Sequence, residues 1–94
     1  MINHDEPETL EITLPRPGAS FRLDPLIPVA GQKITLSARA TDDVKTVQWS
    51  VDGRTVCTAR SPDFRCLWQP VVGSHTIFAI GGGKEARVTM EVIR

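Results

Sequence analysis

The sequence has no excess charge of either sign, and this absence limits the classes of partner. Its 94 residues contain 11 Lys and Arg against 11 Asp and Glu, so the formal net charge is zero. Proteins that bind nucleic acid carry a basic patch on the bound face, and basic amphipathic segments bind membrane surfaces. A balanced chain is typical of neither, so we expect no nucleic-acid partner and no membrane contact by this domain itself.

Long apolar runs and helical periodicity are also missing. No segment approaches the roughly 18 apolar residues of a membrane span, and no apolar stripe with a helical period exceeds two turns. Met1–Glu11 is acidic and lacks the basic-then-apolar order of a signal peptide. The length suits one domain. These features together indicate a single small domain without amphipathic helices.

Residues suited to catalysis or metal binding are scarce. Of the two histidines, His4 lies in the polar N-terminal segment, and His75 begins a predicted strand, where we expect it to pack and form a hydrogen bond. The Ser-x-x-Lys and Lys-Thr-Gly motifs of acyl-serine enzymes do not occur. Two cysteines and two histidines match no zinc spacing. We therefore predict no catalytic residue, no metal site and no cofactor, and we do not expect the isolated domain to be an enzyme.

The residues that are abundant favour β-strands. Val, Ile and Thr number 25, and β-branched side chains fit the pleated surface of a sheet. Apolar and polar residues alternate in short segments that end at Gly, Pro or Asp. About seven such segments predict an all-β sandwich of short, mainly antiparallel strands over residues 9–94. Residues 1–8 are predicted to form a flexible acidic arm or linker remnant. The clearest strands are Thr9–Leu14, Gln32–Thr41, Thr46–Val51, Ser74–Ile80 and Ala86–Val92.

The alternation also predicts which side chains form the core. Ile34 and Leu36 share one face of their strand, and Val47 and Trp49 share one face of theirs, so we predict that all four are buried. The dipeptide that follows, Asp52-Gly53, predicts a two-residue type I′ hairpin turn.

For three parts of the chain, the alternation alone does not fix which side chains face the core. A regular hairpin around the turn would pair Trp49 with Val56 and place Cys57 on the opposite face. Trp68 either packs in the core or lies exposed as a stacking surface. The strand over residues 74–80 buries one of two alternating sets, either His75, Ile77 and Ala79 or Thr76, Phe78 and Ile80.

One loop combines the residue types that dominate binding energies at protein interfaces. The segment from Arg60 to Trp68 contains two arginines and two aromatic residues, and Arg and aromatic side chains are enriched at interface hot spots. Loops on a rigid sandwich are also where binding function is usually located. We therefore predict a binding loop made by Arg60, Phe64, Arg65 and Trp68.

Several segments together resemble one known family. They are Ser20–Pro25 (SFRLDP) with Pro28, Gln32–Leu36 (QKITL), Val47–Trp49 with Asp52-Gly53, Trp68 with Pro70, and Gly73–His75. In this order they resemble the small C-terminal domain of bifunctional penicillin-binding proteins of the 1C type, over most of the chain. The resemblance implies an immunoglobulin-like sandwich in the periplasm. It also implies a parent protein, anchored in the inner membrane, that is a peptidoglycan glycosyltransferase and transpeptidase.

The most specific part of the resemblance has a structural explanation. Phe21 and Leu23 can enter the core from a short edge strand, and the side chain of Asp24 can cap a turn before Pro25. Pro25 and Pro28 remove hydrogen-bond donors from that edge.

The two cysteines are not part of the family pattern. Cys57 and Cys66 flank the loop at neighbouring strand ends, where Cα atoms can approach within disulfide distance. A single pair of cysteines suits an oxidising compartment, so we predict that they form a disulfide.

The expected function is that of a non-catalytic periplasmic accessory module, monomeric in isolation, that contacts a protein or a cell-wall component. The start of the chain, with Met1 directly before a linker-like arm, is typical of a piece of a longer protein. The alternative is a carbohydrate-binding or linker sandwich of a secreted glycoside hydrolase, with Trp68 as the surface on which a sugar stacks.

Overall fold

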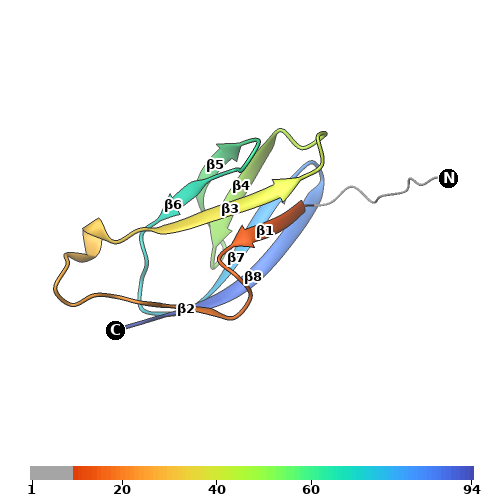
Figure 1. Cartoon of the computed structure of the whole chain (residues 1–94). Coiled ribbons are helices and arrows are strands. Elements are labelled where there is room, and N and C mark those ends of the chain that lie inside the picture. Colours follow the sequence, from red (N-terminus) through yellow and green to blue (C-terminus); the bar gives the residue numbers. More distant parts are fainter. Residues whose placement is uncertain (1–9) are drawn as a thin grey trace.

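The computed structural model describes residues 10–94. The flexible arm that we predicted at residues 1–8 lies outside the described residues. Over residues 10–94 the chain forms eight strands and one 3₁₀ turn (Figure 1). The elements are β1 (Leu10–Leu14), β2 (Ala19–Arg22), η1 (Val29–Gly31), β3 (Ile34–Ala40), β4 (Thr46–Val51), β5 (Arg54–Arg60), β6 (Cys66–Trp68), β7 (Gly73–Gly81) and β8 (Lys84–Ile93).

The strands form two sheets that pack face to face. One sheet has three strands in the order β1-β3-β6, and the other has five in the order β2-β8-β7-β4-β5. Neighbouring strands are antiparallel, except that β2 runs parallel to β8. This arrangement confirms the predicted all-β sandwich, with eight strands where the turn spacing predicted about seven. Within residues 10–94 no helix is long and apolar enough to cross a membrane.

The core lies between the sheets and consists of the inward faces of the strands. Leu36, Val47 and Trp49 have no exposed surface, and Ile34 is 7% exposed. These are the four residues that the alternation predicted to be buried. Burial of one large apolar side chain stabilises a fold by about 1.5–3 kcal/mol, so each of these residues contributes substantially to the stability of the sandwich.

The orientation of β7, which the sequence left open, is settled by the structure. His75, Ile77 and Ala79 point inward and are buried. The alternate residues therefore lie on the outer face of the five-stranded sheet.

The β4–β5 hairpin has the predicted turn. Asp52 and Gly53 have φ angles of 53° and 88°, and a type I′ turn requires positive φ at both of its central positions.

The predicted pairing is correct for the two pairs next to the turn and wrong from Trp49 onward. Ser50 pairs with Thr55, but the register then shifts, and Trp49 pairs with Cys57 instead of Val56. The shift is a β-bulge, which adds one residue to one strand and reverses the facing of the residues that follow. Cys57 therefore shares the inner face with Trp49, and this position allows it to reach β6 in the other sheet.

Candidate functional site

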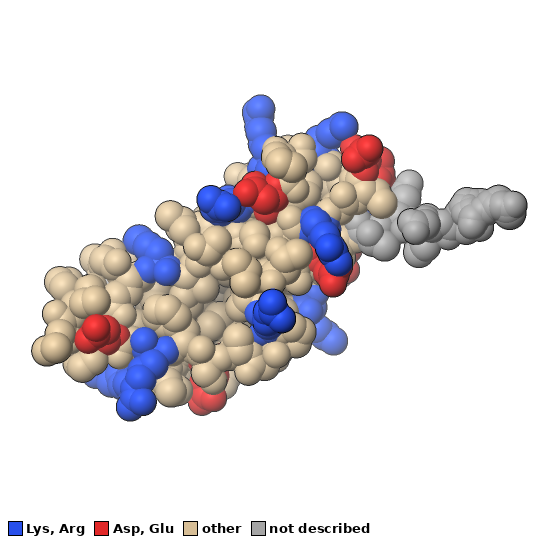
Figure 2. Space-filling view, viewed as in Figure 1, with Lys and Arg blue, Asp and Glu red and all other residues tan. Residues whose placement is uncertain are grey.

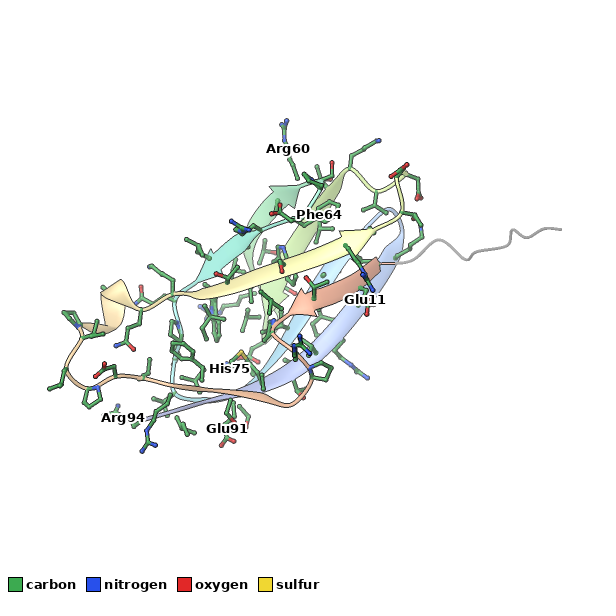
Figure 3. All side chains as sticks on the ribbon, viewed as in Figure 1. Glu11, Arg60, Phe64, His75, Glu91 and Arg94 are labelled. Atoms are coloured by element: carbon green, nitrogen blue, oxygen red, sulfur yellow. A yellow bond between two sulfur atoms is a disulfide. The ribbon has the colours of Figure 1, made fainter. Side chains whose placement is uncertain are left out.

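The loop predicted to bind a partner is anchored in the core. Phe64 is 1% exposed and Trp68 is 8% exposed, whereas Arg60 points away from the sandwich (Figure 3). Burial alternates from Phe64 to Trp68, so that the even-numbered residues point inward and Arg65 and Leu67 point outward. The loop therefore enters β6 with the two-residue period of a strand already established.

Hydrogen bonds fix this loop against three other segments. The indole Nε1 of Trp49 donates to the carbonyl oxygen of Phe64 at 2.8 Å, in a buried contact. The amide of Ala38 donates to the carbonyl oxygen of Asp63 at 3.0 Å, and the amide of Ser61 donates to the carbonyl oxygen of Lys45 at 3.0 Å. Buried backbone groups that lack partners destabilise a fold, so these contacts give the loop a structural role.

The hypothesis of a joint contact surface is consequently wrong for its aromatic members. Phe64 and Trp68 are buried and cannot reach a partner in this structure. Arg65 is exposed and pairs with Asp63 at 3.3 Å, a contact that solvent screens. Binding through Arg60 and Arg65 stays a prediction. The sugar-stacking role suggested for Trp68 loses its basis, because a stacking ring must be open to solvent.

The predicted disulfide between Cys57 and Cys66 is confirmed. The two Cα atoms are 6.5 Å apart, within the range for disulfides. Cys57 lies on β5 and Cys66 on β6, so the bond joins the two sheets. It also closes the loop of residues 57–66 at its base.

His75 is held at both ring nitrogens. Nδ1 lies 2.6 Å from Oδ2 of Asp52, and Nε2 lies 2.5 Å from the carbonyl oxygen of Val71. The ring is 9% exposed and meets Trp68 edge to face, with 4.9 Å between the ring centroids. Both partners are acceptors, an arrangement that suits an imidazolium donating from both nitrogens.

The surroundings of this pair change both pKa values. Burial opposes the charge on the ring, but the hydrogen bonds to Asp52 and Val71 and the negative charge of Asp52 outweigh it and raise the pKa of His75 above 6.5. The backbone amide of Thr76 and the ring of His75 lower the pKa of Asp52 below 3.8. A charged histidine with both nitrogens engaged has no lone pair for a general base. The pair therefore ties the β4–β5 turn to β7, as the expected packing role of His75 requires.

A different feature has the characteristics of a docking surface. Residues 24–32, which we call the Leu26 loop, connect β2 to β3 and contain four consecutive exposed apolar residues, Pro25 to Pro28. Leu26 is 90% exposed and Ile27 is 46% exposed. Exposed apolar runs of this length are unfavourable unless they serve a function.

One buried side chain holds the Leu26 loop in shape. Gln32, which is 8% exposed, accepts from the amide of Asp24 at 2.8 Å. Its Nε2 donates to the carbonyl oxygens of Asp24 at 3.1 Å and Ile27 at 2.8 Å. The carboxylate of Asp24 accepts from the amide of Leu26 at 2.9 Å, which confirms the predicted capping role. These hydrogen bonds hold the loop in the conformation that exposes its apolar residues.

Further exposed apolar residues lie at the same end of the sandwich. Val71 is 62% exposed and Val72 is 45% exposed, and both belong to the β6–β7 connection, which lies at the same end of the sandwich as the Leu26 loop (Figure 1). A cavity of about 320 Å³ opens next to the loop, between Leu23, Ile27 and Arg94. On the face shown in Figure 2, Lys and Arg are interspersed with Asp and Glu.

Sequence reasoning missed the Leu26 loop. Pro25 and Pro28 indicated only the loss of hydrogen-bond donors at that edge. The signal was present in the uninterrupted apolar run between two prolines, but the residue that immobilises it, Gln32, lies eight positions from Asp24. No local pattern indicates a bond of that kind. Within residues 10–94 no group of three or more His, Cys, Asp or Glu gathers to hold a metal ion.

Comparisons with known proteins agree with this architecture. A sequence profile of the family described as Penicillin-Binding Protein C-terminus Family matches residues 2–90. The fibronectin(III)-like modules of Clostridium thermocellum CbhA share 19% identity with a TM-score of 0.71, over 90% of this chain and 96% of that chain. An engineered protein shares 19% identity with a TM-score of 0.59, over 93% of this chain and 20% of that chain. Such structural likeness shows the fold alone. No curated protein sequence matches the chain.

Proposed function

Because the chain belongs to the Penicillin-Binding Protein C-terminus Family, we propose that it is a non-catalytic accessory domain of a peptidoglycan synthase that docks on a protein partner in the periplasm. The domain adds a binding surface to its parent, and the glycosyltransferase and transpeptidase steps belong to the parent's other domains. Its contact with the partner is made by the Leu26 loop.

The observation that carries this proposal is the rigid apolar run from Pro25 to Pro28. Leu26 is 90% exposed on a loop whose backbone is held by Gln32. This exposure adds no stability to a monomer in water. A docking surface gains affinity from this arrangement, because a loop that is already ordered loses little conformational entropy on association. Proline at both ends of the run adds to this rigidity.

The compartment and the required affinity are consistent with such a role. The Cys57–Cys66 disulfide suits an oxidising compartment such as the periplasm. A tethered domain needs little intrinsic affinity, because the link to its parent raises the effective concentration at the partner. A small apolar surface of a few residues is sufficient under those conditions.

The test replaces one exposed leucine with aspartate in the full-length parent. The variant Leu26→Asp is expected to lose most of the partner that the wild type retains after crosslinking in cells. The matched control is Leu67→Asp, which changes an equally apolar residue that is 62% exposed on β6. Both residues are exposed, so both variants are expected to fold, and a melting curve of the excised domain verifies this.

Two results would contradict the proposal. The first is equal recovery of partners by the Leu26→Asp variant and the wild type. The second is a loss of glycosyltransferase or transpeptidase turnover when the domain is removed from the purified parent, because an accessory domain leaves those steps unchanged in vitro.

A further inference from the structure

A second surface, separate from the Leu26 loop, is a groove along one open side of the sandwich. It has a volume of about 390 Å³ and is bordered by the end of β1, by β2 and by the start of β3. Its lining is mostly apolar, and the residues that matter are Leu14, Ala19, Phe21, Ile34 and Met90. The volume is within the range of ligand sites.

The path of the chain creates this groove. After β1 the chain leaves the three-stranded sheet and adds β2 to the five-stranded sheet, beside β8. The two sheets therefore part on this side. Core residues Ile34 and Met90, which are 7% and 4% exposed, form part of its lining.

Two of the three strands that border the groove, β1 and β2, are edge strands. Within residues 10–94, β1 pairs only with β3, and β2 pairs only with β8. The outer edge of each strand therefore has backbone N–H and C=O groups without a strand partner, and such an edge is a template for pairing with an extended chain. A polymer with a regular amide backbone matches this edge, and a sugar chain does not.

The charged residues of the groove have one sign. Among the described residues, Arg16 and Lys33 line it, and no acidic residue does. The Nζ of Lys33 donates to the neutral amide oxygen of Gln69 at 3.3 Å, and no carboxylate within residues 10–94 forms an ion pair with it. Glu11, which lines the neighbouring cavity together with Arg16, is already paired with Arg39 at 3.0 Å.

We propose that this groove binds an extended segment of a partner protein that has an apolar side chain flanked by carboxylates. The segment adds as a strand to a free edge at the groove, its apolar side chain enters between Leu14 and Phe21, and its carboxylates face Arg16 and Lys33. In a strand, residues two positions apart point to the same side. The pattern that fits is therefore acidic, any, apolar, any, acidic.

The site deepens the proposed function by naming the chemistry of a partner segment, but it shares no lining residue with the Leu26 loop. The probe is a blocked heptapeptide, acetyl-Thr-Glu-Thr-Leu-Thr-Glu-Thr-amide, titrated into the ¹⁵N-labelled domain. We expect chemical-shift changes concentrated at residues 14–21 and 33–35. The double variant Arg16→Glu and Lys33→Glu is expected to weaken binding at least tenfold.

Three controls make the result specific. Arg54→Glu with Arg87→Glu makes the same charge change away from the groove and is expected to leave the affinity within twofold. A peptide with Gln in place of both Glu residues is expected to bind at least tenfold more weakly. A peptide N-methylated at alternate amides, which removes the backbone donors, is expected to lose binding.

The proposal is overturned if the probe shifts no groove resonance at millimolar concentration, or if the N-methylated peptide binds as tightly as the parent peptide. It is also overturned if both charge-reversal pairs weaken binding equally, because attraction would then be non-specific. Failure of the Leu26→Asp test does not affect this outcome, since that variant leaves the groove intact.

Discussion

The carboxylate of Asp52 lies 2.6 Å from Nδ1 of His75 and joins the β4–β5 turn to the first residues of β7. Its other oxygen accepts from the amide of Thr76 at 2.9 Å. The turn that reverses β4 into β5 is therefore fixed by the strand on the other side of β4. Because one member of the pair is a histidine, the strength of this link depends on pH.

The first prediction is that stability decreases as the pH rises above about 6.5. The folded protein raises the pKa of His75 above 6.5, so the stabilisation is complete below that pH and is lost as the pH rises through the folded pKa. Asp52 has the opposite dependence, because its pKa is lowered below 3.8. Its contribution is present above that pH and is lost on acidification.

Urea denaturation at a series of pH values measures this profile. The wild type is expected to lose free energy of unfolding as the pH rises above 6.5, and the His75→Gln variant is expected to show a flatter profile there. The Asp52→Asn variant is expected to lower the His75 pKa, as measured by NMR titration of the ring. A His75 pKa below 6.5 in the wild-type protein would contradict the prediction.

The second prediction concerns the disulfide. Cys57 and Cys66 are nine positions apart, and closing a loop of that size reduces the entropy of the unfolded chain by an amount worth about 2–3 kcal/mol. The double variant Cys57→Ser and Cys66→Ser is expected to lose that much free energy of unfolding. Mass spectrometry of denatured, unreduced protein from the periplasm is expected to find no thiol that can be alkylated. Two alkylated cysteines would show that the bond does not form there.

The third prediction separates the two roles of Trp49. Trp49→Ala removes a side chain with no exposed surface and is expected to cost about 3–5 kcal/mol. Trp49→Phe keeps most of the apolar volume but leaves the buried carbonyl of Phe64 without its donor, at a cost of about 1–3 kcal/mol. Chemical denaturation gives both values. A Trp49→Ala variant within about 1 kcal/mol of the wild type would mean that the core lies elsewhere.

The strands and the main core residues could be predicted because they depend on local alternation. Ile34 and Val47 lie on strands whose inward faces are apolar at every second position, and one buried face fixes that pattern. For Cys57 the alternation predicts the wrong face. The bulge near Val56 changes the facing of the next residues, and the apolar pattern of β5 is too weak to reveal it.

The candidate surfaces were predicted less well, for physical reasons that differ. Phe64 and Trp68 entered the predicted binding loop because their residue types suit an interface, although burial was open for Trp68, and the two-residue alternation from Phe64 to Trp68 places both side chains on the inner face. The groove depends on the chain changing sheets after Leu14, which is a tertiary event. The Leu26 loop depends on Gln32, whose three bonds span positions that no short pattern connects.

The last prediction tests that glutamine. Gln32→Ala leaves the amide of Asp24 and the carbonyl oxygens of Asp24 and Ile27 without their partner, and we expect a cost of about 1–3 kcal/mol. The effect on hydrogen exchange in the loop is more specific. The Asp24 amide, which donates to Gln32 at 2.8 Å, is expected to exchange with solvent about tenfold faster, since local opening becomes easier. For the Gln32→Glu variant we expect a stability and an Asp24 exchange rate between those of the wild type and Gln32→Ala. A carboxylate still accepts from the Asp24 amide but cannot donate to either carbonyl.

Leu26→Ala provides the matched control for Gln32→Ala. Its side chain is almost fully exposed, so we expect a stability change within about 0.5 kcal/mol and unchanged exchange at Asp24. The two variants are then expected to weaken partner binding for different reasons. Leu26→Ala removes the contact itself. Gln32→Ala keeps the contact, but the loop then loses more conformational entropy when it binds. Hydrogen exchange followed by NMR distinguishes the two. If the Asp24 amide exchanges at the same rate in Gln32→Ala and in the wild type, the loop is not held by Gln32, and its rigidity has another source.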